Sequence, residues 1–219
     1  MRAMRVDISG SIIPNDSKWL YEWFGMEATC PKDIEKAIAA CSPGEKLEVY
    51  INSSGGEITA GSAIYTALRA FTGKLEINVV GLAASAASVI MCAGHCLISP
   101  TAMVMIHCVS SSAQGNHQDM EKMAETLSKA DRAMCQAYVL KTGKSESKLL
   151  ELMNKTHWMT AEEAVKMGFC DGIMESPTLS ASFGEPIFDA VAVSKVKKLL
   201  EDNDHLKQEK RFIELGGTI

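Results

Sequence analysis

Two periods of hydrophobic pattern alternate along most of the chain. Short runs rich in β-branched residues have the length and composition of buried strands: LEVYINS from residue 47, LEINVVG from residue 75 and AMVMIHCV from residue 102. A fourth run, VDISG from residue 6, alternates apolar and polar positions and predicts a short strand that ends at Gly10. The segments between these runs repeat apolar residues at three- and four-residue steps, which is typical of helices that cover a sheet.

Helix signals fall between the predicted strands. Pro31 lies near the first turn of an amphipathic segment that residues 42–44 close, and residues 85–94 predict a further helix. The helix after residues 55–56 has one apolar face, made by Ile58, Ala60, Ile64, Ala67 and Leu68. Strands separated by helices favour parallel pairing, because each crossover must return the chain to the same end of the sheet. The predicted fold class is therefore α/β.

Three further segments have a helical pattern. Residues 116–152 repeat apolar residues at helical spacing, at Met120, Met123, Leu127, Ala130, Met134, Ala137 and Leu140. Residues 160–168 open with a Thr-Ala-Glu-Glu capping box and stop at Gly168. Near the start, after Asp16 or Ser17, large apolar residues at helical spacing predict part of the core or a subunit contact: Trp19, Leu20, Trp23 and Phe24.

The chain of 219 residues is expected to form one main domain, residues 1–175, followed by a tail, residues 176–219. The tail begins with a Ser- and Pro-rich stretch typical of a linker and continues as a charged segment with a moderate helical pattern. Apolar residues make up 47% and charged residues 22%, as in soluble globular proteins. The net charge of -5 gives no general attraction to nucleic acid or to an anionic membrane, so neither is an expected partner.

Cysteine content and the N-terminal sequence point to the cytoplasm. The seven cysteines are an odd number without a CxxC pair, which favours buried free thiols in a reducing compartment. The N-terminus has no apolar run of signal-peptide length. The longest apolar stretch, residues 77–98, is interrupted by glycines, serines and a histidine and is a poor membrane span. We expect a cytoplasmic protein.

Candidate catalytic groups follow three of the predicted strands. In an open parallel sheet such groups gather at the carboxyl ends of the strands. The glycine pair 55–56 would let backbone amides approach an oxyanion closely, and Ser85 would present its hydroxyl at a helix start. His107, within a predicted strand, would act as the general base that a serine nucleophile needs. Each feature alone also has an ordinary structural explanation, as a turn, a packing residue or a core histidine.

Four segments resemble the Clp protease proteolytic subunit (ClpP) family, in its order and at nearly its spacing, over about residues 45–175. They read YINSSGGEITAGSAIYTAL, GLAASAASVIMCAG, MVMIHCVSSSAQGNHQDMEKMAETL and WMTAEEAVKMGFCDGI. The resemblance implies a ClpP/crotonase-like fold, a repeated β-β-α superhelix, with an extended handle helix at residues 116–140. It also implies a serine endopeptidase whose catalytic core needs no ATP and no cofactor.

The resemblance assigns the site residues one by one. Ser85 corresponds to the nucleophile of the G-x-A-A-S motif, and His107 to the general base. Gly56 and Ala86 match the two positions whose backbone N–H groups hold the oxyanion, while Ser88 would be a packing residue. No histidine spacing such as HExxH is present, so no metal is predicted.

The third member of the triad departs from the family. Relatives carry Asp, or in some viral members Glu, where this chain has Thr156. Loss of the acidic member costs orders of magnitude in rate without abolishing such a site. The Thr156 hydroxyl could still accept a hydrogen bond from the histidine, Asn154 could substitute as an orienting amide, and His157 is a more remote candidate. Asp171 matches a position that the family uses structurally.

The resemblance also implies partners. Family members form seven-membered rings, commonly stacked in pairs around a chamber that admits unfolded chains or short peptides. The loop SSSAQGN before the handle resembles the hinge on which substrate pairs as an added strand. The short start and the segment WLYEWFG resemble the ClpP-like proteases of tailed bacteriophages and prophages, which trim capsid or scaffold chains during head maturation. On this basis we do not expect dependence on an AAA+ unfoldase.

Two alternatives to a phage-type serine endopeptidase remain open. One is a catalytically weak or inactive ClpP-like ring component, for which the threonine at position 156 is the main support. The other is a crotonase-type acyl-CoA enzyme, because that superfamily shares the architecture and holds an enolate with paired backbone amides. The crotonase alternative is the weaker one, because that superfamily lacks the Ser-plus-His pair and no adenine-binding segment is evident here.

Overall fold

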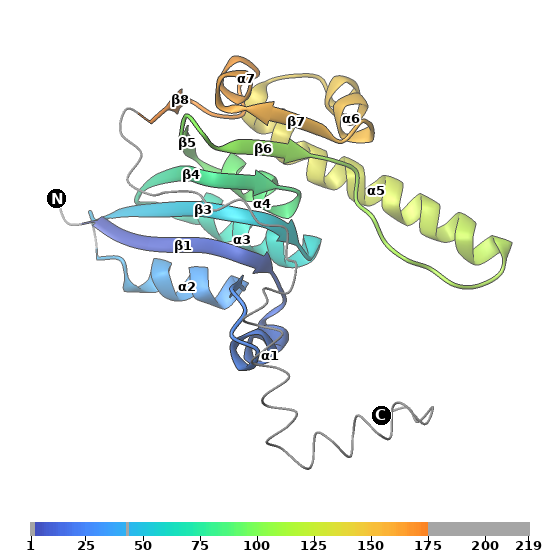
Figure 1. The fold of residues 1–219 in the computed structure, drawn as a ribbon, viewed down its shortest axis with the longest axis horizontal. Helices are drawn as coiled ribbons and strands as arrows, with labels where there is room; N and C mark the ends of the chain where they lie inside the picture. Colours follow the sequence, from blue (N-terminus) through green and yellow to red (C-terminus); the bar gives the residue numbers. More distant parts are fainter. Residues whose placement is uncertain (1–2, 43, 175–219) are drawn as a thin grey trace, which may run out of the picture.

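Parallel strands joined by helical crossovers form the body of the molecule (Figure 1). The structure, a computed structural model, describes residues 3–42 and 44–174. Among these residues, six of the seven strand pairings are parallel, and only β6 and β7 run antiparallel. The strands are β1 (Ala3–Ile12), β2 (Ala28–Thr29), β3 (Lys46–Gly56), β4 (Lys74–Ala84), β5 (His95–Ile98), β6 (Met103–Ile106), β7 (His157–Thr160) and β8 (Gly172–Ile173). The predicted α/β class is confirmed.

The sheet divides along one edge of β4. Its order is β2-β1-β3-β4-β5-β8, and β6 pairs with both β4 and β7. The first half of β4 pairs with β5 over residues 76–79, whereas its end pairs with β6 over residues 82–84. The end of β4 therefore lies beside the end of β6, and the segments that follow these two strands leave the sheet at the same place.

Helices connect and cover the strands. They are α1 (Lys18–Trp23), α2 (Pro31–Ala40), α3 (Ile58–Ala70), α4 (Ala86–Ile90), α5 (His117–Thr142), α6 (Glu146–Asn154) and α7 (Ala161–Lys166), with short 3-10 turns η1 (Asn15–Ser17) and η2 (Met91–Ala93). Pro31 opens α2, and the predicted capping box of Thr160 and Glu163 starts α7. In Figure 1, the N-terminal half of α5 extends away from the sheet, as the predicted handle helix would.

The core lies between the sheet and helices α2 to α4. Leu47, Val49 and Ile51 alternate along β3 and are fully buried, as the period of a strand requires. From α3, Ile64 and Leu68 of the predicted apolar face are buried against them. Burial of each such side chain contributes about 1.5–3 kcal/mol, so these elements are held mainly by apolar packing.

Two predicted boundaries, the end of the first strand and the end of the long helix, are wrong, and in each case a glycine explains the difference. β1 does not end at Gly10 but continues to Ile12 through a register shift. Gly10 has φ +65°, and a Cβ there would lie 2.0 Å from the Glu27 carbonyl oxygen, so glycine serves a bulge rather than a strand end. Conversely, the helical pattern of residues 116–152 is broken at Gly143, whose φ of +68° ends α5 before α6 begins.

Three further predictions need correction. β5 was hidden inside the apolar stretch of residues 77–98 and gave no separate strand signal. His107 does not lie within β6, which ends at Ile106. Trp19 and Trp23 on α1 are 65% and 47% exposed, so they do not belong to the core of this chain. The predicted tail, residues 176–219, lies outside the described residues.

Across the described part of the chain, no helix has both the length and the apolar character to cross a membrane. The seven cysteines, all within the described residues, are free thiols, and five of them are buried.

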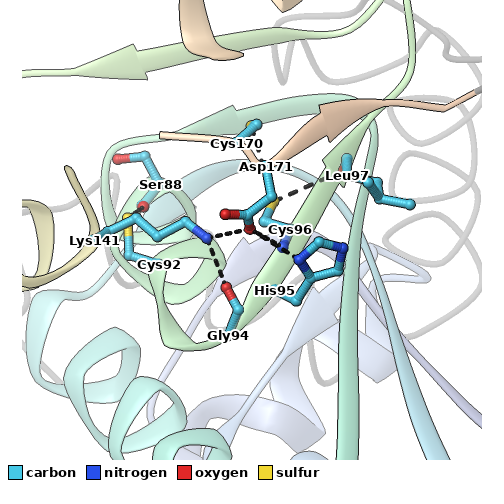
Figure 2. Close-up of polar contacts among 9 residues, drawn as sticks. All are labelled: Ser88, Cys92, Gly94, His95, Cys96, Leu97, Lys141, Cys170 and Asp171. Carbon is cyan, nitrogen blue, oxygen red and sulfur yellow. Dashed lines mark hydrogen bonds and ion pairs between the residues drawn. The ribbon is translucent and has the colours of Figure 1, made fainter. Parts of the chain in front are cut away.

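A nearly buried lysine joins the end of α5 to the sheet (Figure 2). The Lys141 ammonium donates to the Gly94 carbonyl at 2.8 Å and forms an ion pair with Asp171. Asp171 also accepts the backbone N–H of Cys96 at 2.7 Å, which connects the start of β5 to the turn before β8. Burial alone would raise the pKa of the Asp171 carboxyl, but the hydrogen bonds from Lys141 and Cys96 outweigh it and lower that pKa.

We predict that Asp171→Asn lowers the free energy of unfolding at pH 7 by about 1–2 kcal/mol, because a hydrogen-bonded charge is lost at a site that is 37% exposed and partly screened. Since the folded pKa is lowered, this stabilisation is present above the unfolded pKa and is lost as the pH falls below about 4. Urea unfolding followed by circular dichroism at pH 7 and pH 3 measures both effects.

The matched control is Glu151→Gln, which removes a carboxylate from exposed ion pairs with Lys148 and Lys155. We expect no measurable change in the unfolding midpoint at pH 7. An Asp171→Asn protein as stable as the wild type at pH 7 would contradict the assignment of the Lys141 cluster as a structural anchor.

Candidate active site

Ser85 stands at the junction of β4 and α4 in a strained backbone conformation. Its φ of +54° and ψ of -124° lie in a region that non-glycine residues rarely adopt. The Ser85 N–H donates to the carbonyl of Met105 on β6 at 3.0 Å. The Ser85 carbonyl accepts the backbone N–H of Ser88 at 3.0 Å and its hydroxyl at 2.6 Å. The peptide groups on both sides of Ser85 are therefore fixed.

His107 lies within hydrogen-bond distance of this serine. Its Nε2 atom is 2.8 Å from the Ser85 Oγ atom, and both side chains are half-buried. The parallel pairing of β4 with β6, which aligns Ala84 with Met105, explains the approach, because each chain continues from there into the same space. The structure thus brings together the predicted serine and histidine.

Two further predicted residues border the same pocket. Gly56 and Ala86 line it together with Ser85 and His107. Ala86 is the first residue of α4, so its N–H has no acceptor within the helix. Gly56 ends β3 with φ +151°, and a Cβ there would lie 2.1 Å from the carbonyl oxygen of Ile12. Only glycine fits at this position.

Ser53 organises the glycine turn, and sequence reasoning missed it. Its buried hydroxyl donates to the Gly10 carbonyl at 2.6 Å and accepts the Gly55 N–H at 3.1 Å. Gly55 has φ +98° and approaches Ser85 closely, because a Cβ there would lie 2.7 Å from the Cβ of Ser85. A serine two residues before a glycine is a turn signal that could have indicated this role.

The walls of the pocket are largely apolar. Ile58 of α3, Val89 of α4 and Met134 of α5 contribute aliphatic and thioether groups, and Val109 closes the side of the loop after β6.

The place of the third triad member is occupied, but without the predicted hydrogen bond. β6 and β7 pair Ile106 with His157, so the register continued by one residue puts Thr156 opposite His107. Thr156 is exposed and has φ +49°. Among residues 3–42 and 44–174, no hydrogen bond joins His107 to Thr156, Asn154 or His157.

Asn154, the amide considered for this role, is engaged elsewhere. The Asn154 side-chain oxygen accepts a hydrogen bond from the Cys108 thiol at 3.2 Å. Burial, followed by the charge of Asp131, raises the pKa of Cys108 to about 11, so this thiol stays protonated as a donor. Asp171 belongs to the Lys141 anchor, as predicted for a structural residue.

Ser88 does more than pack. It is fully buried, and its hydroxyl is 2.7 Å from the hydroxyl of Tyr138 on α5, in addition to its bond to the Ser85 carbonyl. Burial raises the pKa of the Tyr138 phenol, which stays protonated at neutral pH. Tyr138 lines the pocket, but the sequence did not predict this, because Tyr138 lies 53 positions after Ser85 in an ordinary amphipathic pattern.

No group of three His, Cys, Asp or Glu side chains within the described ranges is placed to hold a metal ion.

In a comparison with protein-family models, the model described as Clp protease matches residues 36–177, more than half of the chain. The match includes every residue of the pocket described above.

We predict that Gly55→Ala slows any reaction at Ser85 by about a hundredfold or more, because the new Cβ would push against the Ala84 carbonyl oxygen, 2.7 Å away, and against Ser85 itself. The rate of covalent labelling of Ser85 measures this effect. The control is Gly44→Ala, which shares a positive φ of +81° but has no atom within 4 Å of its Cβ and lies at the opposite end of β3. Equal losses in the two variants would show that backbone strain alone, not crowding of Ser85, is responsible.

Proposed function

Because this chain belongs to the Clp protease family, whose members are peptidases, we propose that it is a serine endopeptidase with Ser85 as nucleophile and His107 as general base. The observation that carries the proposal is the 2.8 Å contact between Ser85 Oγ and His107 Nε2 in a pocket that Gly56 and Ala86 also line. Geometry of this kind permits proton transfer during attack on an acyl carbon.

The proposed reaction follows the acyl-enzyme route. Ser85 Oγ attacks the peptide carbonyl carbon while His107 Nε2 takes the hydroxyl proton. The carbonyl oxygen becomes an oxyanion, and the N–H groups of Gly56 and Ala86 are the proposed donors that stabilise it. The C–N bond then breaks, and His107 gives the proton to the departing amine. A water molecule, deprotonated by His107, releases the acyl group and restores Ser85.

The proposed substrate is an extended polypeptide. Family members act on polypeptides and typically form rings, and the apolar walls of the pocket suit an apolar side chain beside the scissile bond. We extend the proposal to a homo-oligomeric ring of seven subunits, single or stacked. The exposed Met120 on the projecting part of α5 supports such contacts.

Head maturation in a phage or prophage is the proposed setting. Its support is the resemblance of residues 19–25, WLYEWFG, to phage-type members, and the exposure of Trp19 and Trp23 on α1. Capsid or scaffold chains would then be the substrates, and no unfoldase would be needed.

A weak or inactive member of the family is the second candidate. It is favoured by Thr156, which stands opposite His107 in place of a carboxylate and does not bond to it. The two candidates differ in whether the Ser85 hydroxyl is activated.

Labelling with a fluorophosphonate probe tests the proposed function, because the probe reacts only with an activated serine. We expect the wild-type chain to be labelled on Ser85, and Ser85→Ala and His107→Ala to lose at least 99% of the labelling rate. Digestion and mass spectrometry identify the labelled residue. An unlabelled wild type would favour the inactive candidate, and undiminished labelling of His107→Ala would exclude this histidine as the base.

We predict that Thr156→Asp raises kcat for a peptide substrate by about tenfold or more, because a carboxylate opposite His107 would orient the imidazole and stabilise its cation. The φ of +49° at this position also suits Asp better than Thr. Thr156→Asn is the control, since it relieves the same backbone strain without adding charge. An equal gain in both variants would assign the effect to the backbone rather than to the carboxylate.

A further inference from the structure

One helix makes a hydrogen bond to each of the two catalytic segments. Asp131 and Tyr138 lie seven residues, about two turns, apart on α5 and therefore share a face of that helix. Asp131 contacts the segment that carries His107, and Tyr138 contacts the segment that carries Ser85. No other described element supplies side-chain hydrogen bonds to both segments.

Asp131 holds the chain just after the histidine. Its carboxylate accepts the backbone N–H of Val109 at 2.6 Å, two residues beyond His107. The chain has already left β6 there, so this bond replaces a strand pairing that the segment no longer has. On the other side, the Cys108 N–H donates to the carbonyl of Met153 at 3.2 Å. The backbone that carries the imidazole is therefore fixed at two points.

Tyr138 holds the nucleophile through a relay whose direction can be deduced. The Ser88 hydroxyl has one proton, and its 2.6 Å bond to the Ser85 carbonyl uses it. The 2.7 Å contact between the two hydroxyls must then have Tyr138 as donor and Ser88 as acceptor. The relay from Tyr138 through Ser88 to the Ser85 carbonyl holds that carbonyl in place and so helps to maintain the ψ of -124° in the strained backbone of Ser85.

A further polar contact of α5, near its C-terminal end, fixes the position of the helix along its own axis. Lys141, one turn after Tyr138, reaches the carbonyl of Gly94 and the carboxylate of Asp171 (Figure 2). Its side chain is only 9% exposed, so a shift of α5 would leave a desolvated ammonium without partners. The helix is thus a fixed frame for the two bonds nearer the pocket.

We propose that Asp131 and Tyr138 are positioning residues, which align the Ser85 and His107 segments through α5 and take over the orienting task of the absent triad carboxylate. The inference rests on the proposed function, because it concerns the same hydroxyl and imidazole. Neither residue touches the reacting atoms, so each acts through the backbone of its segment.

The test measures kcat and KM for a chromogenic peptide with an apolar residue before the scissile bond, and the rate of fluorophosphonate labelling, on full-length chains at 25 °C. Tyr138→Phe keeps the ring and its packing against Phe169, with the ring centroids 5.6 Å apart, but removes the donor. We expect kcat and the labelling rate to fall about tenfold or more with KM within about twofold, because only alignment of the reacting groups is lost. Ser88→Ala should fall equally, and the double variant no further, because both residues act through one relay.

The matched control is Tyr65→Phe on α3. The Tyr65 hydroxyl is also buried and has no hydrogen-bond partner among the described residues. We expect its rates to equal those of the wild type. A Tyr138→Phe chain that labels as fast as Tyr65→Phe would overturn the inference for Tyr138, while a wild type that is not labelled at all would instead overturn the proposed function.

Asp131 is tested by rescue. Asp131→Ala removes the acceptor and should lower kcat about tenfold, whereas Asp131→Asn keeps a side-chain oxygen for the Val109 N–H and should restore kcat to within about threefold of the wild type. If Asn and Ala are equally slow while both chains melt at the wild-type temperature, the backbone bond to Val109 is not what aligns the histidine. If Tyr138→Phe does not fold, Ser88→Ala and this rescue still decide the inference.

Discussion

The backbone of Ser85 is the constraint on which the rest of the site depends. A non-glycine residue at φ +54° and ψ -124° costs of the order of 1–3 kcal/mol, and such a conformation persists only where its surroundings determine it. Here the N–H is held by Met105 and the carbonyl by Ser88, so neither peptide plane can rotate alone. The hydroxyl therefore leaves the end of β4 toward His107, and the N–H of Ala86, at the start of α4, has no acceptor within that helix.

Small residues surround this turn because other elements approach it closely. A Cβ on Gly55 would overlap the Ser85 side chain, and one on Gly61 of α3 would lie 2.9 Å from the Cβ of Ala86. The run GLAASAAS therefore consists of small residues, because α4 packs against both β3 and α3. The two serines within it differ in exposure: Ser85 is half-buried and lines the pocket, whereas Ser88 is fully buried.

The sequence allowed the parts of this site to be predicted where the signal is local. Ser85 follows a strand and opens a helix, and the glycine pair ends another strand, so both could be placed from neighbouring residues. β5 could not, because its four residues, His95–Ile98, continue an apolar stretch and are too few to be distinguished from it by their period. Asp131 and Tyr138 were missed for another reason: their partners lie 22 and 50 positions away, and an amphipathic helix pattern says nothing about which groups its polar residues meet.

With Thr156 in place of a carboxylate, two tasks of that carboxylate must be considered separately: orienting the imidazole and stabilising its positive charge. The strand register still places position 156 opposite His107, and the positive φ there is one that Asp or Asn tolerates better than Thr, so the backbone retains the form of a site for an acidic residue. The bonds of α5 can supply the orienting part of that residue's task, because they fix the segments that carry the hydroxyl and the imidazole. They cannot supply the other part, since a neutral relay and a carboxylate already bound to an N–H would not neutralise the imidazolium that the proposed proton transfer would form. Stabilisation of that cation is therefore the step in which this site differs most from a triad with a carboxylate beside its histidine.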